Sequence, residues 1–253
     1  MKIARFVTAG DDPRYGIVDG DALVVLRADP MFAGFDTTGE RVPLVEAKVL
    51  APVIPRSKVV AVGRNYADHA KEFGNDVPAE PLLFLKPNTS VIGPGDAIVL
   101  PPQSERVEFE GELAVIIGKI AKNVSEEDAA SVIFGYSVAN DVTARDLQRS
   151  DGQWSRAKGF DTFCPVGPVI ETDFEAAGKR IGTSVNGEVK QDGTLDDMVF
   201  SVPQIIAYAS AAFTLLPGDI ILTGTPAGVG PIVAGDRVEV AVEGIGTLTN
   251  PVR

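Results

Sequence analysis

The sequence predicts an α+β fold that is mainly β, with short strands joined by tight turns. Its 253 residues include 26 Gly and 18 Pro, which are scattered between short apolar runs and not pooled in one linker. Asn186-Gly187 and Asp19-Gly20 each lie between runs of strand-forming residues and predict two hairpins. Helical patterns are few, and strands and helices do not alternate regularly, which argues against a parallel α/β fold.

Thirteen segments predict strands because their apolar residues alternate or form short continuous runs. These segments are Lys2–Val7, Tyr15–Val18, Ala22–Leu26, Lys58–Val62, Leu82–Lys86, Ala97–Leu100, Glu108–Ile117, Val132–Asn140, Val166–Glu171, Ile181–Val185, Asp219–Thr223, Arg237–Val242 and Gly246–Asn250. The segment 51–57 carries two prolines and follows a small β-rich start. We therefore expect a small N-terminal domain at 1–55 and a main domain at 56–253.

Two capping boxes predict the starts of helices. Ser201 is followed by Pro203 in the first turn and by Gln204, and the apolar stripe after them fits one buried helical face. We expect Pro217-Gly218 to end this helix. The run Ser125-Glu126-Glu127-Asp128 predicts a shorter helix that leads toward Ile133.

Charge and composition exclude several classes of function. The chain has 23 basic and 35 acidic residues, a net charge of −12, so it lacks the basic surplus that binds nucleic acids or anionic membranes. Cys164 is the only cysteine, which excludes an intramolecular disulfide, and His69 is the only histidine, which excludes a multi-histidine metal site. No signal peptide or membrane-spanning apolar run is visible, so we expect a soluble, cytoplasmic protein.

An alternation of acids precedes an apolar run in the segment 106–118. Period-two geometry places Glu108, Glu110 and Glu112 on the same side of a strand. A solvated face on an edge strand is one explanation, and it fits most acidic alternations. The run Leu113–Ile117 instead favours burial, and carboxylates ~5–7 Å apart on a buried face take up protons or gather around a cation. Oxygen ligands favour Mg²⁺, Mn²⁺ or Ca²⁺ over zinc.

A second polar cluster follows the predicted strand that ends at Asn140. Asp141 lies at the strand end, and the residues after it form a turn or short helix. Arg145 and Gln148 are three residues apart and can share a helical face. A capped helix start with a surface ion pair explains the same pattern.

The remaining polar motifs can supply a base, a cation and an anion-binding loop. His69 and Glu72 are three residues apart, and a carboxylate beside an imidazole raises its basicity; an ordinary surface histidine is the alternative. The polar run after them favours a mobile lid. Lys158 lies in a partly apolar loop and can be a surface lysine, whereas Thr225 lies in a glycine-rich loop whose amides suit an anion. Cys164 fits a buried structural thiol.

Taken in order, these motifs resemble the fumarylacetoacetate hydrolase family. The matching pieces are Gly63-Arg64-Asn65-Tyr66 with His69 and Glu72, Phe84-Leu85-Lys86-Pro87, Glu110-Gly111-Glu112-Leu113, Asp141-Val142-Thr143-Ala144-Arg145-Asp146, Lys158-Gly159-Phe160-Asp161 and Thr223-Gly224-Thr225-Pro226. They span roughly residues 58–250, and six short motifs in register are far more specific than any one of them. The resemblance implies a mixed β-roll or sandwich catalytic domain of the family's C-terminal type, usually a homodimer, that holds Mg²⁺ or Mn²⁺.

The resemblance also assigns roles to residues of this sequence. It implies that Glu110, Glu112 and Asp141 are the metal ligands, and that Lys158 steadies a developing enolate or the substrate carboxylate. It places the substrate-binding residues at Arg145, Gln148 and Thr225, and the catalytic base pair at His69 and Glu72 on a lid of about residues 66–80. It gives Glu108 no ligand role and leaves the role of Lys86 open.

One departure narrows the subgroup. Long-form fumarylacetoacetases carry a further Asp ligand seven residues before the histidine, where this chain has Val62. The chain therefore resembles the short, chiefly bacterial members. The implied activity is metal-dependent cleavage of a C–C bond in an acylpyruvate-type 2-oxo acid through a metal-stabilised enolate. The alternatives are an isomerase or decarboxylase of 2-hydroxyhepta-2,4-diene-1,7-dioate from aromatic catabolism, an oxaloacetate decarboxylase, or a non-catalytic Ca²⁺-binding protein.

Overall fold

A large mixed sheet of twelve strands organises the computed structural model, which describes residues 1–253. Its strands are β1 (Lys2–Val7), β2 (Arg14–Asp19), β3 (Ala22–Leu26), β4 (Thr37–Pro43), β5 (Lys48–Leu50), β6 (Val59–Gly63), β7 (Leu82–Lys86), β8 (Val91–Ile92), β10 (Gly111–Ile117), β11 (Ile133–Asn140), β13 (Cys164–Glu171) and β16 (Ile220–Leu222). The order along the sheet is β4-β3-β2-β1-β13-β11-β10-β16-β6-β7, with β5 paired to β1 and β8 paired to β13. Most neighbours are antiparallel, and β16 with β6 is a parallel pair.

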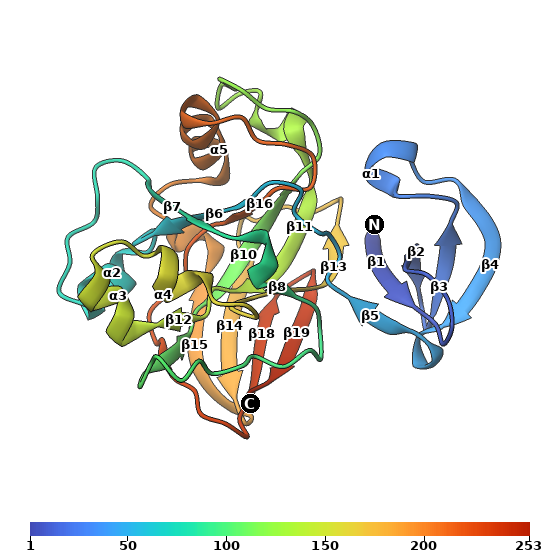
Figure 1. Ribbon diagram of the computed structural model, residues 1–253. Helices are drawn as coiled ribbons and strands as arrows, with labels where there is room; N and C mark the ends of the chain where they lie inside the picture. The colour runs from blue at the N-terminus through green and yellow to red at the C-terminus, as the bar shows by residue number, and fades with distance from the viewer.

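Two smaller sheets complete the β structure. Their strands are β9 (Val107–Phe109), β12 (Thr143–Ala144), β17 (Gly230–Pro231), β14 (Arg180–Val185), β15 (Glu188–Thr194), β18 (Arg237–Val242) and β19 (Gly246–Pro251). The three-stranded sheet has the order β12-β9-β17 and the four-stranded sheet the order β15-β14-β18-β19. Figure 1 shows the four-stranded sheet below β10 and β11, and the mainly β fold that the sequence predicts is confirmed.

The helices are short and lie around the sheets. They are α1 (Pro30–Ala33), α2 (Ala67–Glu72), α3 (Arg145–Asp151), α4 (Ser155–Gly159) and α5 (Val202–Ala212), with 3₁₀ turns at η1 (Leu44–Glu46), η2 (Asn88–Ser90), η3 (Ala129–Val132) and η4 (Leu195–Asp197). Figure 1 shows α2, α3 and α4 together on one side of the large sheet, beside β7 and β12, whereas α5 lies apart from them. None of these helices has the length and apolar character that crossing a bilayer requires.

The first fifty residues form a β unit that extends the large sheet (Figure 1). β1 pairs antiparallel with β13 through Lys2 opposite Glu171 and Ile3 opposite Ile170. The amide of Thr172 also donates to the carbonyl of Met1 at 3.1 Å. The N-terminal strands therefore cover one edge of the strands that carry the rest of the fold.

The core lies on both faces of the central strand β10, every residue of which is buried. Leu113, Val115 and Ile117 belong to one apolar cluster, whereas Ala114 and Ile116 belong to a second cluster on the opposite face. Successive side chains of a strand point to opposite faces, so a continuous apolar run is what a strand covered on both sides requires. The burial predicted from the run Leu113–Ile117 is confirmed.

The capping box at Ser201 is confirmed, but the helix that it starts ends earlier than predicted. Ser201 and Gln204 exchange reciprocal hydrogen bonds at the start of α5. The helix stops at Ala212, not at Pro217-Gly218, because Phe213 is extended and Leu215 forms a β-bridge with Ala121. This pairing draws the chain away from the helical path before the proline is reached.

Two other predicted elements are shorter than expected. The motif at Ser125 precedes only the 3₁₀ turn η3, because the Ser125 hydroxyl contacts Asp128 within a tight turn. The predicted strand Ala97–Leu100 is wrong, since only Ile98 forms a bridge, to Val252. The segment still runs beside the residues 249–253, since the amides of Gly95, Ile98 and Leu100 donate to the carbonyls of Thr249, Pro251 and Arg253.

The carboxylate of Asp219 ties two distant segments together beneath the large sheet. It is fully buried and accepts from the Ser57 hydroxyl at 2.7 Å, the Lys58 ammonium at 2.7 Å and the Leu216 amide at 2.9 Å. Burial opposes its ionisation, but the hydrogen bonds from Lys58 and Leu216 outweigh burial and lower the pKa of Asp219. The charged carboxylate is therefore the stable form in the fold.

We expect Asp219→Asn to destabilise the protein by about 3 kcal/mol, because it leaves the Lys58 ammonium without its partner. Urea unfolding at pH 7 measures the loss, with Asp12→Asn on the exposed surface as the control. Since the pKa of Asp219 is lowered, its contribution is present above about pH 4 and fades as the pH falls further. A change below about 0.5 kcal/mol would contradict this role.

Candidate active site

A cavity of about 410 Å³ opens beside α2, α3 and α4 and collects most of the polar motifs of the sequence. Its lining residues are Val62, Gly63, Arg64, His69, Ala70, Phe73, Asn75, Phe84, Glu110, Glu112, Asp141, Arg145, Gln148, Arg149, Trp154, Lys158 and Thr225. They come from five separated parts of the chain. The cavity therefore brings together eight of the nine residues that the sequence assigns to the site, with Glu72 behind His69 as the ninth.

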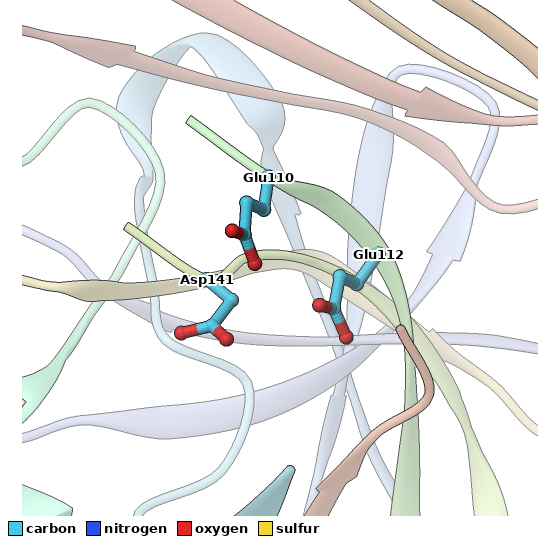
Figure 2. Close-up of side chains that lie close together, drawn as sticks. All are labelled: Glu110, Glu112 and Asp141. Carbon is cyan, nitrogen blue, oxygen red and sulfur yellow. The ribbon is translucent and has the colours of Figure 1, made fainter. Parts of the chain in front are cut away.

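The three acids proposed as metal ligands converge in this cavity. Oxygens of Glu110, Glu112 and Asp141 all lie within 4.8 Å of one another, and their carboxylates face one point in Figure 2. The backbone fixes this geometry, because the Glu110 amide donates to the Asn140 side chain at 2.9 Å and the Asp141 amide donates to the Glu110 carbonyl at 2.8 Å. The acid triad is thus built by the pairing of β10 with β11.

The acidic segment is not the single strand that its alternation predicts. The strand is interrupted at Glu110, where the chain leaves the three-stranded sheet after β9 and joins the large sheet at β10. Glu108, Glu110 and Glu112 are only 1%, 4% and 2% exposed, so the solvated-face explanation is wrong. Gly111 is required between them, because a Cβ there would lie 2.2 Å from the Thr183 hydroxyl.

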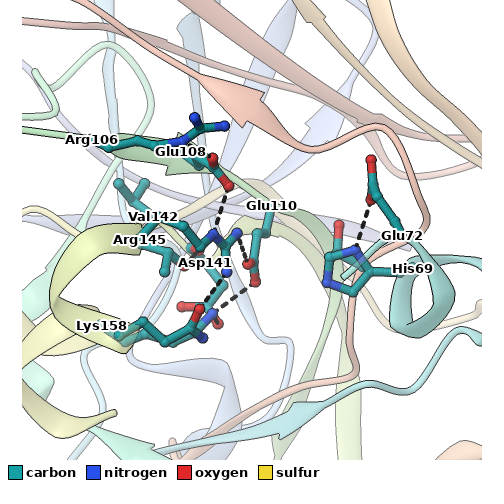
Figure 3. Close-up of polar contacts among 12 residues, drawn as sticks. His69, Glu72, Arg106, Glu108, Glu110, Asp141, Val142, Arg145 and Lys158 are labelled. Atoms are coloured by element: carbon teal, nitrogen blue, oxygen red, sulfur yellow. Dashed lines mark hydrogen bonds and ion pairs between the residues drawn. The ribbon is translucent and has the colours of Figure 1, made fainter. Parts of the chain in front are cut away.

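Two lysines form ion pairs with carboxylates of the acid triad. Lys158 donates to Glu110 at 2.7 Å and to Asp141 at 2.6 Å (Figure 3). Lys86 donates to the other oxygen of Asp141. Burial opposes the charge of Lys158, but Asp141 and Glu110 outweigh it and raise its pKa. Lys158 lies in α4 and not in the predicted loop, because residues 155–159 form one helical turn that points the ammonium inward. The surface-lysine alternative is also wrong, since Lys158 is buried.

Arg145 joins the triad to the outer acid Glu108. Its guanidinium donates to Glu108 at 2.6 Å and to Glu110 at 2.6 Å (Figure 3). It also donates to Gln148 at 2.7 Å. The shared helical face of Arg145 and Gln148 is confirmed, since both lie on α3. Burial opposes ionisation of Glu110, but Lys158 and Arg145 together lower the pKa of Glu110 well below its usual range. The substrate contacts proposed for Arg145 and Gln148 stay a prediction.

Glu112 is the one triad carboxylate that no cation contacts. It accepts a hydrogen bond from the Gly224 amide at 2.6 Å, and burial, then Asp141 and Glu110, raise its pKa well above the usual value. At Gly224, the anion that faces the glycine-rich loop 223–231 is therefore the protein's own Glu112. Three buried carboxyl groups, one of them without a cationic partner, are a donor set that suits a divalent cation held by oxygen ligands.

The proposed base pair lies across the cavity from Arg145. His69 is 8% exposed on α2, and its Nδ1 lies 3.3 Å from Glu72, as the helical spacing predicts (Figure 3). Glu72 also accepts from the Gly228 amide at 3.3 Å, which anchors α2 to the glycine-rich loop. Burial lowers the pKa of His69 despite the neighbouring Glu110 and Glu72, so the imidazole is neutral at pH 7. The surface-histidine alternative is wrong, whereas the mobility of the segment 66–80 stays a prediction.

Gln191 is a site residue that the sequence analysis missed. It donates to the Thr225 hydroxyl at 2.7 Å and accepts from the Gly111 amide at 3.0 Å, so it fixes Thr225 beside the triad. Gln191 is buried on β15, a polar hairpin strand without an apolar pattern, and nothing local in the sequence distinguishes it. Cys164, by contrast, is the buried thiol that the sequence predicts, and burial raises its pKa to about 12.

Two protein-family models match this chain. The family model described as "Fumarylacetoacetate (FAA) hydrolase C-terminal" matches residues 58–253, and the model "Rv2993c-like, N-terminal" matches residues 1–52. The chain belongs to the fumarylacetoacetate hydrolase family. It is therefore an enzyme. Val62, the position at which the sequence resembles the short members, lies buried in the cavity wall.

Three proteins that are similar to this chain carry different names within the family. Protein Rv2993c of Mycobacterium tuberculosis is 56% identical over 261 residues, covering 100% of this chain and 98% of its own. The mitochondrial oxaloacetate tautomerase FAHD2A of Homo sapiens is 46% identical over 222 residues, covering 83% of this chain and 71% of its own. The crystal structure of 2-hydroxyhepta-2,4-diene-1,7-dioate isomerase from Mycobacterium marinum has a TM-score of 0.92 at 47% identity, with 100% and 98% of the two chains covered.

We expect Glu112→Gln to weaken Mn²⁺ binding at least about 10-fold while leaving the metal-free protein at least as stable as the wild type. The amide removes a charge that burial, Asp141 and Glu110 disfavour, but it is a poor cation ligand. Calorimetric titration with MnCl₂ measures binding, and urea unfolding in EDTA measures stability. Glu105→Gln, at an exposed acid nearby, is the control, and wild-type Mn²⁺ affinity in Glu112→Gln would remove Glu112 from the ligand set.

Proposed function

We propose that this protein uses Mg²⁺ or Mn²⁺ to cleave a C–C bond in an acylpyruvate-type 2-oxo acid. The observation that carries the proposal is one cavity with a buried acid triad on one side and, on the other, a neutral His69 whose Nδ1 faces Glu72. Such an arrangement separates a site for a cation from a site for a general base. Hydrolysis of a 2,4-dioxo acid needs both.

Glu110, Glu112 and Asp141 would hold the cation. All three donors are carboxylates, which favours the hard ions Mg²⁺ and Mn²⁺. When bound, the ion supplies Lewis acidity toward the carboxylate and C2 oxygens of a 2-oxo acid. A purely structural Ca²⁺ site is disfavoured, because such sites fill six to eight positions with oxygens, whereas here Lys86 and Lys158 occupy one flank of the triad.

The protein's own residues supply the rest of the reaction. Glu72 fixes the proton of His69 on Nδ1, so Nε2 is free to take a proton from water. The water oxygen then adds to the C4 carbonyl of the substrate, and the C3–C4 bond breaks to release the carboxylic acid that contains C4 and the enolate of pyruvate. The proton held on Nε2 of His69 is transferred to C3, which completes pyruvate. The buried ammonium of Lys158 stabilises the charge of the enolate without prior reorganisation, and the walls of Phe73 and Phe84 limit access of bulk water.

Keto–enol isomerisation is the second candidate reaction. It needs the same charge stabilisation at C2, with His69 moving a proton to and from carbon instead of activating water. Two relatives at 46% and 47% identity are named a tautomerase and an isomerase of 2-oxo or 2-hydroxydienoic acids. For either reaction, we propose that the substrate is a small 2-oxo acid and that the protein is a homodimer.

A substrate panel tests the proposed function. Acetylpyruvate, fumarylpyruvate, oxaloacetate and 2-hydroxyhepta-2,4-diene-1,7-dioate are each incubated with Mg²⁺, with Mn²⁺ and after exhaustive dialysis against EDTA. We expect an acylpyruvate to release pyruvate only when the metal is present. Product analysis measures this release. Proton exchange at C3 or isomerisation without cleavage would favour the second candidate, and turnover that survives dialysis would refute both.

We expect His69→Ala to slow acylpyruvate hydrolysis by about 10²–10⁴-fold, because it removes the general base. Decarboxylation of oxaloacetate needs no attacking water, so the same variant should lose less of that activity. Steady-state assays on both substrates measure the two losses. Asp68→Ala, at an exposed neighbour on α2, is the control. Equal losses on the two substrates would argue against water activation by His69.

A further inference from the structure

A second cavity lies where the N-terminal β unit meets the rest of the fold. It has a volume of about 340 Å³ and shares no lining residue with the active-site cavity. Its walls come from the N-terminal unit, from the connecting segment 53–56 and from the turn Pro217-Gly218 that precedes β16. A cavity of this size between two parts of a fold is a typical place for a small ligand.

Two arginines of this second cavity have no anionic partner in the protein. Arg5 and Arg56 both line the cavity, and neither forms an ion pair or donates a side-chain hydrogen bond. Asp29 is the one acid of the lining, and its carboxylate accepts from the Met31 amide at 3.0 Å and from the Tyr15 hydroxyl at 3.4 Å. Two arginines and one aspartate give the lining a net charge of +1, in a protein whose net charge is −12.

Strand pairing and a stacking contact hold the two guanidinium groups at this cavity. Arg5 lies directly opposite Tyr15 in the antiparallel pairing of β1 with β2, so both side chains project from the same face of the sheet. The Arg56 guanidinium lies over the Phe32 ring, 4.4 Å from its centroid. Stacking of this kind occupies the face of a guanidinium and leaves its N–H groups free to donate in their own plane. The two cations therefore come from different segments and are both available to an anion.

Much of the remaining lining is apolar and partly open to solvent. Phe32 and Ile54 are 53% and 59% exposed, and both lie beside the buried residues Val53 and Pro55 in the wall of the cavity. A ligand with an apolar body would remove this surface from water while its charged group pairs with the arginines. The lining thus favours an organic anion over an inorganic anion and over a neutral apolar molecule.

The second cavity and the active-site cavity lie at opposite ends of the same two strands. β6 and β16 form a parallel pair. Arg56 precedes β6 and Gly218 precedes β16, and both line the second cavity. Gly63 at the end of β6 and Thr225 after the end of β16 line the active-site cavity. A strand rises about 3.3 Å per residue, so roughly 15 Å of strand separates the two cavities.

We propose that the second cavity binds a small carboxylate with an apolar body, held by Arg5 and Arg56. Both guanidinium groups donate to the carboxylate oxygens, and the apolar body covers Phe32 and Ile54. The inference goes beyond the proposed function and does not rest on it, because the two cavities share no residue. Since the ligand contacts both the N-terminal unit and the segment that leads into β6, its binding stabilises the junction between them.

Calorimetric titration of the full-length protein with sodium benzoate at pH 7 tests this site. Benzamide lacks the charge and acetate lacks the apolar body, so each should bind at least about 10-fold more weakly than benzoate. Arg5→Gln and Arg56→Gln should each weaken benzoate binding about 10-fold or more. Asp29→Asn should strengthen it, because the substitution removes the opposing charge of the lining while an asparagine still caps α1. A gain in affinity cannot arise from a damaged fold.

Two further arginine variants locate the bound benzoate. Arg27→Gln changes an exposed arginine of the N-terminal unit outside the cavity, and Arg149→Gln changes an arginine of the active-site cavity. Both variants should keep the wild-type affinity. Loss of binding in Arg149→Gln alone would place benzoate in the active-site cavity and overturn the second site. Absence of binding to the wild type at millimolar benzoate, or unchanged affinity in both Arg5→Gln and Arg56→Gln, would overturn it as well.

Discussion

Mutual repulsion of three buried carboxylates is the constraint around which this protein is arranged. Carboxylate oxygens of Glu110, Glu112 and Asp141 lie within 4.8 Å of one another, and all three residues are buried. Such a cluster is costly unless cations or hydrogen bonds compensate it. Lys86 and Lys158 supply that compensation from β7 and α4, two elements that lie in contact with each other. The positions of β7 and α4 thus place two ammonium groups where they compensate the charge of the buried carboxylates.

The glycine-rich loop 223–231 connects the two sides of the cavity. Its Gly224 amide binds Glu112 of the triad, and its Gly228 amide binds Glu72 of the base pair. Backbone amides can approach carboxylates this closely where no side chain intervenes, and both glycines have positive φ. One short segment therefore fixes the distance between the acid side and the base side.

Elements that local chemistry determines are predictable from the sequence. β1, β3, β7 and β18 have the predicted bounds, and the spacing of His69 and Glu72 gives the observed contact. Elements that depend on distant partners are not predictable in this way. The strand β4 is polar and almost wholly exposed, so no apolar alternation marks it. The break at Glu110 arises because β9 and β10 pair with different sheets, which the alternation of acids cannot reveal.

The pairing of β1 with β13 has a consequence for any attempt to isolate the catalytic region. A truncated chain beginning near residue 56 would lose the neighbour that satisfies the backbone around Ile170. It would uncover an apolar strand border of the kind that templates intermolecular association. The leading fifty residues thus cover a strand edge that the catalytic region would otherwise expose.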